Sequence, residues 1–73
     1  MDREALRERI AHRPNNVRFE ELRRLLEAYG WEHVRTAGSH HIMQRGTETF
    51  SLPYRKPTVK AAYVRRALQL TED

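Results

Sequence analysis

The segment Gly38-Ser39-His40-His41 carries the side chains of this sequence that are best suited to chemistry. An imidazole, with an ordinary pKa of about 6.5, accepts or donates a proton near neutral pH and can act as a general base or acid. Neighbouring residues of a β-strand point to opposite faces of a sheet. We therefore expect the two histidines to have different surroundings and different roles.

The residues that follow assign a face to each histidine. Ile42 is expected to face the core, which places His40 on the buried side, where a neighbouring backbone group would bond its ring. The opposite, exposed face would carry Ser39, His41, Met43 and Arg45. His41 is therefore the catalytic candidate, and an ordinary surface histidine is the alternative that this pattern leaves open.

Metal and cofactor sites are not predicted. The two imidazoles diverge, and no Asp, Glu or Cys lies nearby at the spacing of metal ligands. The sequence contains no Cys, which excludes disulfides and thiolate sites and fits a reducing, cytoplasmic location. No apolar run approaches the ~20 residues that span a bilayer, so no membrane association is expected.

Positive charge is concentrated in the C-terminal half of the chain. Residues 1–32 contain seven Arg and seven acidic residues, whereas residues 33–71 contain seven Lys or Arg and a single acid, Glu48. This excess of six charges suits the phosphate backbone of RNA, and a merely solvated basic surface is the alternative. The basic residues are Arg35, Arg45, Arg55, Lys56, Lys60, Arg65 and Arg66.

The elements that must position these side chains follow from periodicity and turn signals. Helices are expected over residues 2–12 and 19–29, the second because apolar residues recur at helical spacing until Gly30 ends it. Three strands are expected within residues 31–36, 40–44 and 48–52, with turns at 37–39 and 45–47. In the third strand, Phe50 and Leu52 would face the core and Thr49 and Ser51 the solvent.

A last helix is expected after the basic loop 54–57, with Thr58 as its N-cap and Ala61, Val64 and Leu68 as its buried stripe. The predicted fold is a single α+β domain over residues 1–73. A three-stranded antiparallel sheet would have the helices on one face and leave the other exposed.

These features together resemble the HicA family of toxins, small RNA-cleaving proteins of bacterial type II toxin–antitoxin systems. The resemblance lies in the leucine-rich helix LRRLLEAYGW, the Gly-Ser-His-His turn and strand, the apolar strand ending at Pro53 and the basic C-terminal helix. It covers nearly the whole chain. It implies a fold like the double-stranded-RNA-binding domain, in the order α-β-β-β-α, with an additional N-terminal helix.

The resemblance also implies an activity and partners. It indicates a metal-independent endoribonuclease that cleaves mRNA, inhibits translation and is held inactive by a cognate HicB-like antitoxin. The second histidine of the Gly-Ser-His-His segment, His41, would be the catalytic base for attack of the 2′-hydroxyl on its phosphate. Many members also carry a histidine shortly after the strand-ending proline. Here Tyr54 and Arg55 follow Pro53, so the general acid stays unassigned.

RNA contacts are predicted for basic and turn residues around this site: Ser39, Arg45, Arg55, Lys56, Lys60, Arg65 and Arg66. Arg45 would lie ~13 Å along the strand from His41 and hold a neighbouring phosphate, with Arg55 or Lys60 closer. Tyr54 and Tyr63 either stack on unpaired bases or cover edges of the core.

Two other functions remain open from the sequence. One is a non-catalytic RNA-binding module that uses the same basic surface to recognise shape and 2′-hydroxyls. The other is an interaction protein whose exposed sheet face serves a partner. An exposed His41 favours the nuclease, because pure binding requires cations there and no imidazole.

Overall fold

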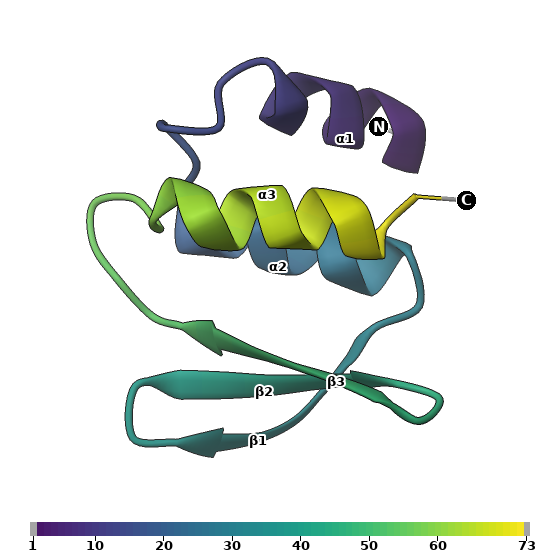
Figure 1. Cartoon of the computed structure of the whole chain (residues 1–73), viewed down its shortest axis with the longest axis vertical. Helices are drawn as coiled ribbons and strands as arrows, with labels where there is room; N and C mark the ends of the chain where they lie inside the picture. Colours follow the sequence, from purple (N-terminus) through teal and green to yellow (C-terminus); the bar gives the residue numbers. More distant parts are fainter. Residues whose placement is uncertain (1, 73) are drawn as a thin grey trace.

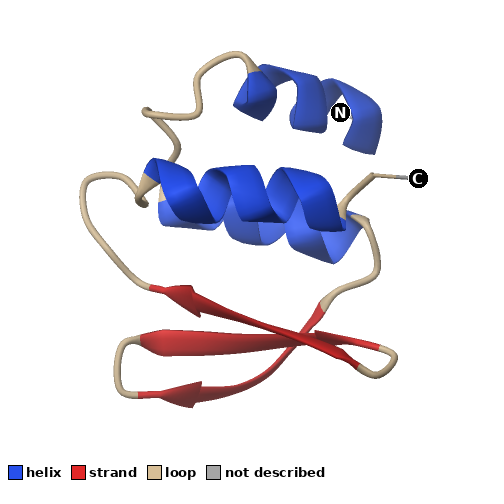
Figure 2. Ribbon diagram, in the orientation of Figure 1, coloured by secondary structure: helices blue, strands red, loops and turns tan. Residues whose placement is uncertain are grey.

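Three helices and a three-stranded antiparallel sheet form the fold, which a computed structural model describes for residues 2–72 (Figure 1). Helices α2 and α3 cover one face of the sheet, and α1 lies on the far side of that helix layer (Figure 2). The predicted α+β class, the order of elements and the placement of the helices on one face are confirmed. The elements are α1 (Arg3–Ala11), α2 (Phe19–Ala28), β1 (Glu32–Ala37), β2 (His40–Arg45), β3 (Glu48–Pro53) and α3 (Ala61–Leu70).

Helix α1 is attached to the rest of the domain by buried and hydrogen-bonded side chains, among them Ile10 and Arg7. Ile10 is fully buried, and Arg7 donates hydrogen bonds to the Leu68 carbonyl oxygen at 2.6 Å and to the Thr71 hydroxyl at 3.1 Å. The Asp2 side chain caps the helix by accepting from the backbone N–H of Ala5 at 2.8 Å. The start of the chain is thus fastened to the end of α3.

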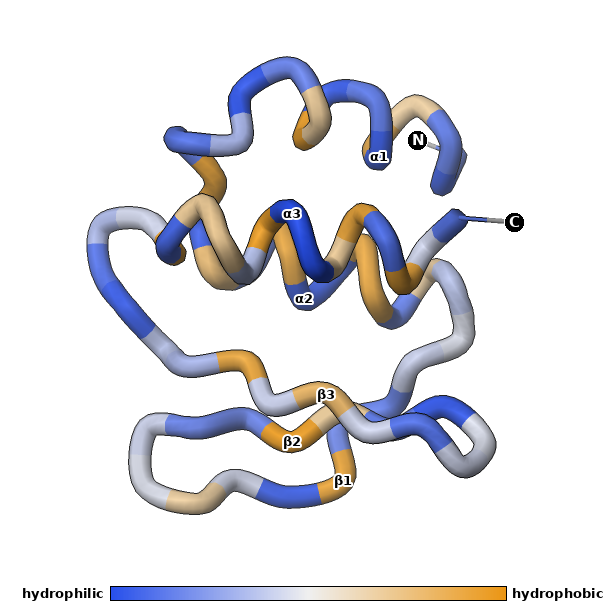
Figure 3. The backbone as a smooth tube through the Cα atoms, in the orientation of Figure 1, coloured by the Kyte–Doolittle hydropathy of each residue, from blue (hydrophilic) through white to orange (hydrophobic). Residues whose placement is uncertain are grey.

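Helix α2 supplies the largest part of the core. Its predicted stripe of Phe19, Leu22, Leu25 and Leu26 is buried, and Gly30 follows the helix with a φ of 93°, a conformation that glycine adopts without strain. Hydrophobic positions recur along α2 and α3, whereas the first part of the loop between β3 and α3 is hydrophilic (Figure 3). None of the helices among residues 2–72 is long and apolar enough to cross a membrane.

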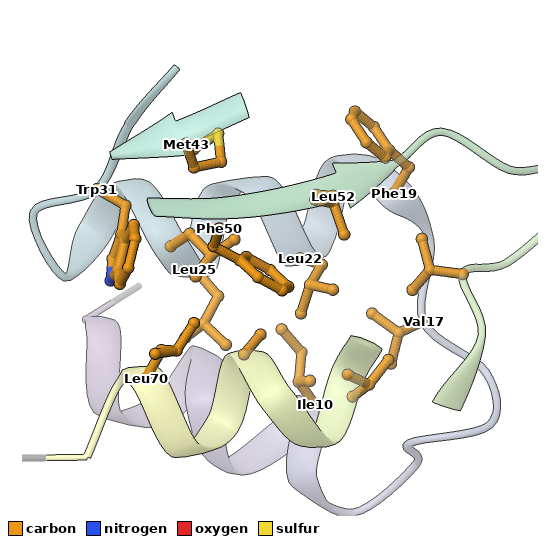
Figure 4. Close-up of a cluster of buried hydrophobic side chains, with 14 of the residues drawn as sticks. Ile10, Val17, Phe19, Leu22, Leu25, Trp31, Met43, Phe50, Leu52 and Leu70 are labelled. Atoms are coloured by element: carbon orange, nitrogen blue, oxygen red, sulfur yellow. The ribbon is translucent and has the colours of Figure 1, made fainter. Parts of the chain in front are cut away.

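The register of the sheet decides which side chains face the helices. A two-residue turn at 46–47 places Arg45 opposite Glu48, so Met43 pairs with Phe50. Partners in an antiparallel ladder share a face. Met43 and Phe50 are both buried in the core between the sheet and the helices (Figure 4), as is Leu52 opposite His41.

Two predictions about β2 are therefore wrong. Met43, expected on the exposed face, is fully buried, and Ile42, expected in the core, is only half-buried opposite Ser51 on the open face. The physical reason is the pairing with β3, since Phe50 and Leu52 already occupy the helix-facing side. Their prediction as core residues is confirmed, and so is the placement of Thr49 and Ser51 on the opposite side.

The start of α3 also differs from the prediction. Lys60, and not Thr58, is the N-cap, because Val59 is buried and its N–H donates to the Val17 carbonyl at 2.9 Å, which keeps the segment extended. The buried stripe of the helix consists of Val64, Ala67 and Leu70. Of the predicted stripe, Ala61 and Leu68 are only half-buried.

Candidate active site

The β1–β2 turn, the end of β3 and the start of α3 meet at one corner of the molecule. Gly38 has a φ of 61° in the turn, and the backbone N–H of Tyr54 donates to the Ser39 carbonyl oxygen at 2.7 Å. His40 lies opposite Pro53 in the β2–β3 register. Three segments that are separate in the sequence therefore meet at this corner.

A surface hollow of about 250 Å³, which we call the His40 hollow, opens at this corner. It combines one imidazole with two cationic side chains, and no carboxylate belongs to its lining. Within residues 2–72, no acidic side chain forms an ion pair with either cation. The hollow is thus a positively charged recess suited to an anion. Its lining residues are His40, Pro53, Tyr54, Arg55, Lys60 and Tyr63.

His40 is exposed and contacts a polar partner on the open face of the sheet. Its Nδ1 lies 3.1 Å from the Ser51 hydroxyl oxygen. The prediction that His40 faces the core is wrong, because Met43 takes the helix-facing side of β2 and reverses the assignment of faces. When Nδ1 carries the ring proton and donates it to Ser51, Nε2 keeps a lone pair that can accept a proton.

His41 points the other way, toward the helix layer. Its ring centroid lies 4.6 Å from that of Phe19 and 5.1 Å from that of His33, and its Nδ1 is buried without a hydrogen-bond partner among the described residues. Burial, and to a lesser degree the charges of His33 and Arg23, lowers the pKa of His41 below its usual value. His41 is half-buried on the helix-facing side of the sheet, so the prediction that it lies on the open face is wrong, although the two histidines do diverge as expected.

The predicted RNA-binding residues separate into three groups. Ser39, Arg55 and Lys60 lie at the corner, and the exposed Lys56 follows directly in the same loop. Arg65 and Arg66 are both exposed along α3. Arg45 is not brought to the corner, because it lies at the opposite end of β2.

Arg45 is occupied by contacts within the fold. Its guanidinium lies 5.0 Å from the centre of the Trp31 ring and donates to the Tyr29 carbonyl and to Glu48, at 3.3 and 3.2 Å. A cation that packs on an aromatic ring and has its own counter-ion contributes mainly to stability. Arg45 therefore differs from Arg55 and Lys60.

Sequence reasoning missed Phe19 and His33 as neighbours of the histidine pair. His33 pairs with Met43 and so shares the face of His41, and the β1–β2 register is irregular between His33 and Arg35. Its Nε2 lies 2.8 Å from the Thr36 hydroxyl. An irregular register breaks the strict alternation of a strand and leaves no signal in the sequence.

Metal-ligating side chains do not gather at the corner. Within residues 2–72, no three His, Cys, Asp or Glu residues lie close enough together to hold a metal ion. The groups that are available at the corner are an imidazole, an arginine, a lysine and two phenols.

The fold and the corner define a small basic α+β protein with an imidazole beside two cations that form no ion pair within residues 2–72. The sequence profile described as the HicA toxin of bacterial toxin–antitoxin systems matches residues 19–72, so this chain belongs to the HicA toxin family. The resemblance inferred from the sequence is thereby confirmed, and the protein is a toxin whose natural counterpart is an antitoxin. The match begins with α2 and leaves α1 outside it. Comparisons with curated proteins and with solved structures gave no match.

Proposed function

We propose that this toxin is a metal-independent endoribonuclease that cleaves mRNA in the cytoplasm and thereby inhibits translation. The observation that carries the proposal is the His40 hollow, where an exposed imidazole lies in one recess with Arg55 and Lys60. A proton acceptor beside two cations can promote cleavage of an RNA phosphodiester, by activating the nucleophile and by stabilising the charge that develops on the phosphate. A cognate HicB-like antitoxin would be its partner.

The reaction uses the 2′-hydroxyl of the RNA as nucleophile. Nε2 of His40 takes the hydroxyl proton, the oxygen attacks the adjacent phosphorus, and the 5′ oxygen leaves with a proton from solvent. A cyclic 2′,3′-phosphate remains on one fragment and a 5′-hydroxyl on the other. Arg55 and Lys60 would stabilise the negative charge that develops on the phosphorane oxygens.

His40 is the better placed of the two histidines for this role. It is exposed and lines the hollow with the cations, and its bond to Ser51 orients the ring. His41 belongs to the other face, against Phe19, and is absent from the lining of the hollow. Its lowered pKa keeps it neutral at pH 7, which suits either a base or a packed imidazole.

Paired substitutions test this assignment. His40→Ala should lower RNA cleavage by about 10²–10⁴-fold and abolish growth arrest on expression, because the general base is lost. The thermal midpoint should change little, since exposed substitutions usually cost under ~0.5 kcal/mol. His41→Ala should instead lower the thermal midpoint, because it empties space beside Phe19. Cleavage per folded molecule should persist in that variant and in excess EDTA.

The control is His12→Ala, which removes an exposed imidazole from the far side of the helix layer. It should leave both cleavage and growth arrest unchanged. If folded His41→Ala is inactive while His40→Ala cuts RNA normally, the base is His41, as the sequence alone predicts. If neither histidine matters for purified protein but RNA still binds, the chain is a non-catalytic RNA-binding module.

A further inference from the structure

A second hollow adjoins the first at the basic loop. It has a volume of about 360 Å³, and Tyr54 and Arg55 line both hollows. We call it the Tyr54 hollow. Its lining consists of Arg18, Phe19, Glu20, Tyr54, Arg55, Lys56 and Pro57.

Tyr54 is held in place by one contact of its backbone and one contact of its ring. Its backbone N–H is bonded to the Ser39 carbonyl at 2.7 Å, and its ring meets Phe19 edge-on, with centroids 5.0 Å apart and planes at 69°. Even so, the residue is 37% exposed, which makes it one of two large hydrophobic residues exposed in the described chain. An aromatic ring fixed in position yet open to solvent can receive a second ring at little entropic cost.

The charges around the ring favour an anionic ligand. Three of the lining residues are cations, namely Arg18, Arg55 and Lys56, against one carboxylate, Glu20. The Lys56 ammonium lies 6.0 Å from the centre of the Tyr54 ring. Within residues 2–72, no carboxylate forms an ion pair with Arg55 or Lys56. The hollow therefore offers a flat apolar surface beside phosphate-binding groups.

We propose that the Tyr54 hollow binds one unpaired nucleotide of single-stranded RNA, next to the phosphate that occupies the His40 hollow. The base of this nucleotide stacks on the Tyr54 ring, and Lys56 and Arg18 contact the phosphate of the same nucleotide. Arg55, which lines both hollows, contacts the phosphate that links this nucleotide to the one bound at the His40 hollow. This inference rests on the proposed function, because the His40 hollow fixes where the cleaved bond lies. It makes Tyr54 a residue that selects unpaired RNA.

Binding of a non-cleavable RNA tests the stacking contact without any contribution from cleavage. The probe is a short, fluorescently labelled 2′-O-methyl RNA of mixed sequence, and the control probe is the same backbone without bases. Tyr54→Ala should weaken binding of the RNA by about tenfold, because one base–aromatic stack is removed. Tyr54→Phe should bind within about twofold of the wild type, since it keeps the ring.

The probe without bases distinguishes stacking from charge. All three proteins should bind it equally, because there is nothing to stack on residue 54. If Tyr54→Ala leaves RNA binding unchanged, or weakens both probes to the same extent, the proposal is overturned. Where Tyr54→Ala lowers the thermal midpoint, Tyr54→Leu replaces it, because Leu keeps an apolar contact with Phe19.

The two proposals fail in different ways. If cleavage depends on His40 but RNA binding does not depend on Tyr54, the protein is a nuclease and its RNA follows a path outside the Tyr54 hollow. If RNA binding depends on Tyr54 but the purified protein does not cut RNA, the Tyr54 hollow is an RNA-binding site and the proposed nuclease activity is wrong.

Discussion

The two ends of the β2–β3 hairpin both carry basic side chains but use them differently. At the turn end, Arg45 covers Trp31 and is bonded to Glu48 and to the Tyr29 carbonyl. At the open end, Arg55 and Lys60 border a hollow, and no ion pair within residues 2–72 involves either of them. Net charge counts these residues equally, whereas their contacts distinguish a structural cation from one available to a ligand.

Substitutions at the two ends should separate activity from stability. Arg55→Ala or Lys60→Ala should lower kcat for RNA cleavage by about 10²-fold or more, because each removes positive charge from the developing phosphorane. The thermal midpoint should stay within a few degrees. Single-turnover cleavage of labelled RNA, together with thermal unfolding, measures both quantities.

Arg45→Ala is the matched variant at the turn end. It should lower the free energy of unfolding by about 1–2 kcal/mol, because it removes the cation that covers Trp31 together with two hydrogen bonds. Cleavage per folded molecule should remain near that of the wild type. The contrast between the two ends breaks down if Arg45→Ala loses activity without losing stability.

The stability of the folded chain should depend on pH through His41. Burial lowers its pKa in the folded chain, so between that pKa and the unfolded value of about 6.5 the unfolded chain binds more protons. The stability that follows is fully present above about pH 6.5 and is lost as the pH falls through the lowered pKa. His41→Phe, which keeps an aromatic ring against Phe19, should flatten the decline of the thermal midpoint below pH 6.5. Identical pH profiles for the two proteins would contradict this.

The smallest expected effect concerns the middle of α3. Arg65 and Arg66 are exposed, and Arg66 also contacts Gln69 at 3.1 Å. If RNA extends along the helix, replacing both with Ala should reduce the slope of log affinity against log salt by roughly 0.7 for each phosphate that the helix no longer neutralises. Anisotropy titrations of non-cleavable RNA over a range of salt concentrations give this slope. An unchanged slope would confine the RNA path to the two hollows.

The sequence was sufficient to predict the architecture because its signals are local. The apolar spacing of α2, the positive-φ Gly30 and the alternation of Phe50 and Leu52 each act within a few residues. The face of the histidines was predicted wrongly from the apolar character of Ile42 alone. A two-residue turn at 46–47 would have placed Met43 opposite Phe50 and hence in the core.

The remainder of the site depends on contacts between distant segments. The extended path to Lys60 is set by the bond between Val59 and Val17, and the position of Tyr54 by its bond to Ser39. The contact between His33 and His41 depends on the pairing of His33 with Met43 across β1 and β2. No local pattern encodes such contacts, so neither hollow could be predicted from residue spacing.

The hydrogen bonds from Arg7 to Leu68 and Thr71 affect when α1 can be fastened to α3 during synthesis of the chain. Arg7 precedes these partners by 61 and 64 positions, so α1 is synthesised long before these two partners. A helix of nine residues is marginal on its own in water. The contacts of α1 with the end of α3 therefore form only after α3 has been synthesised.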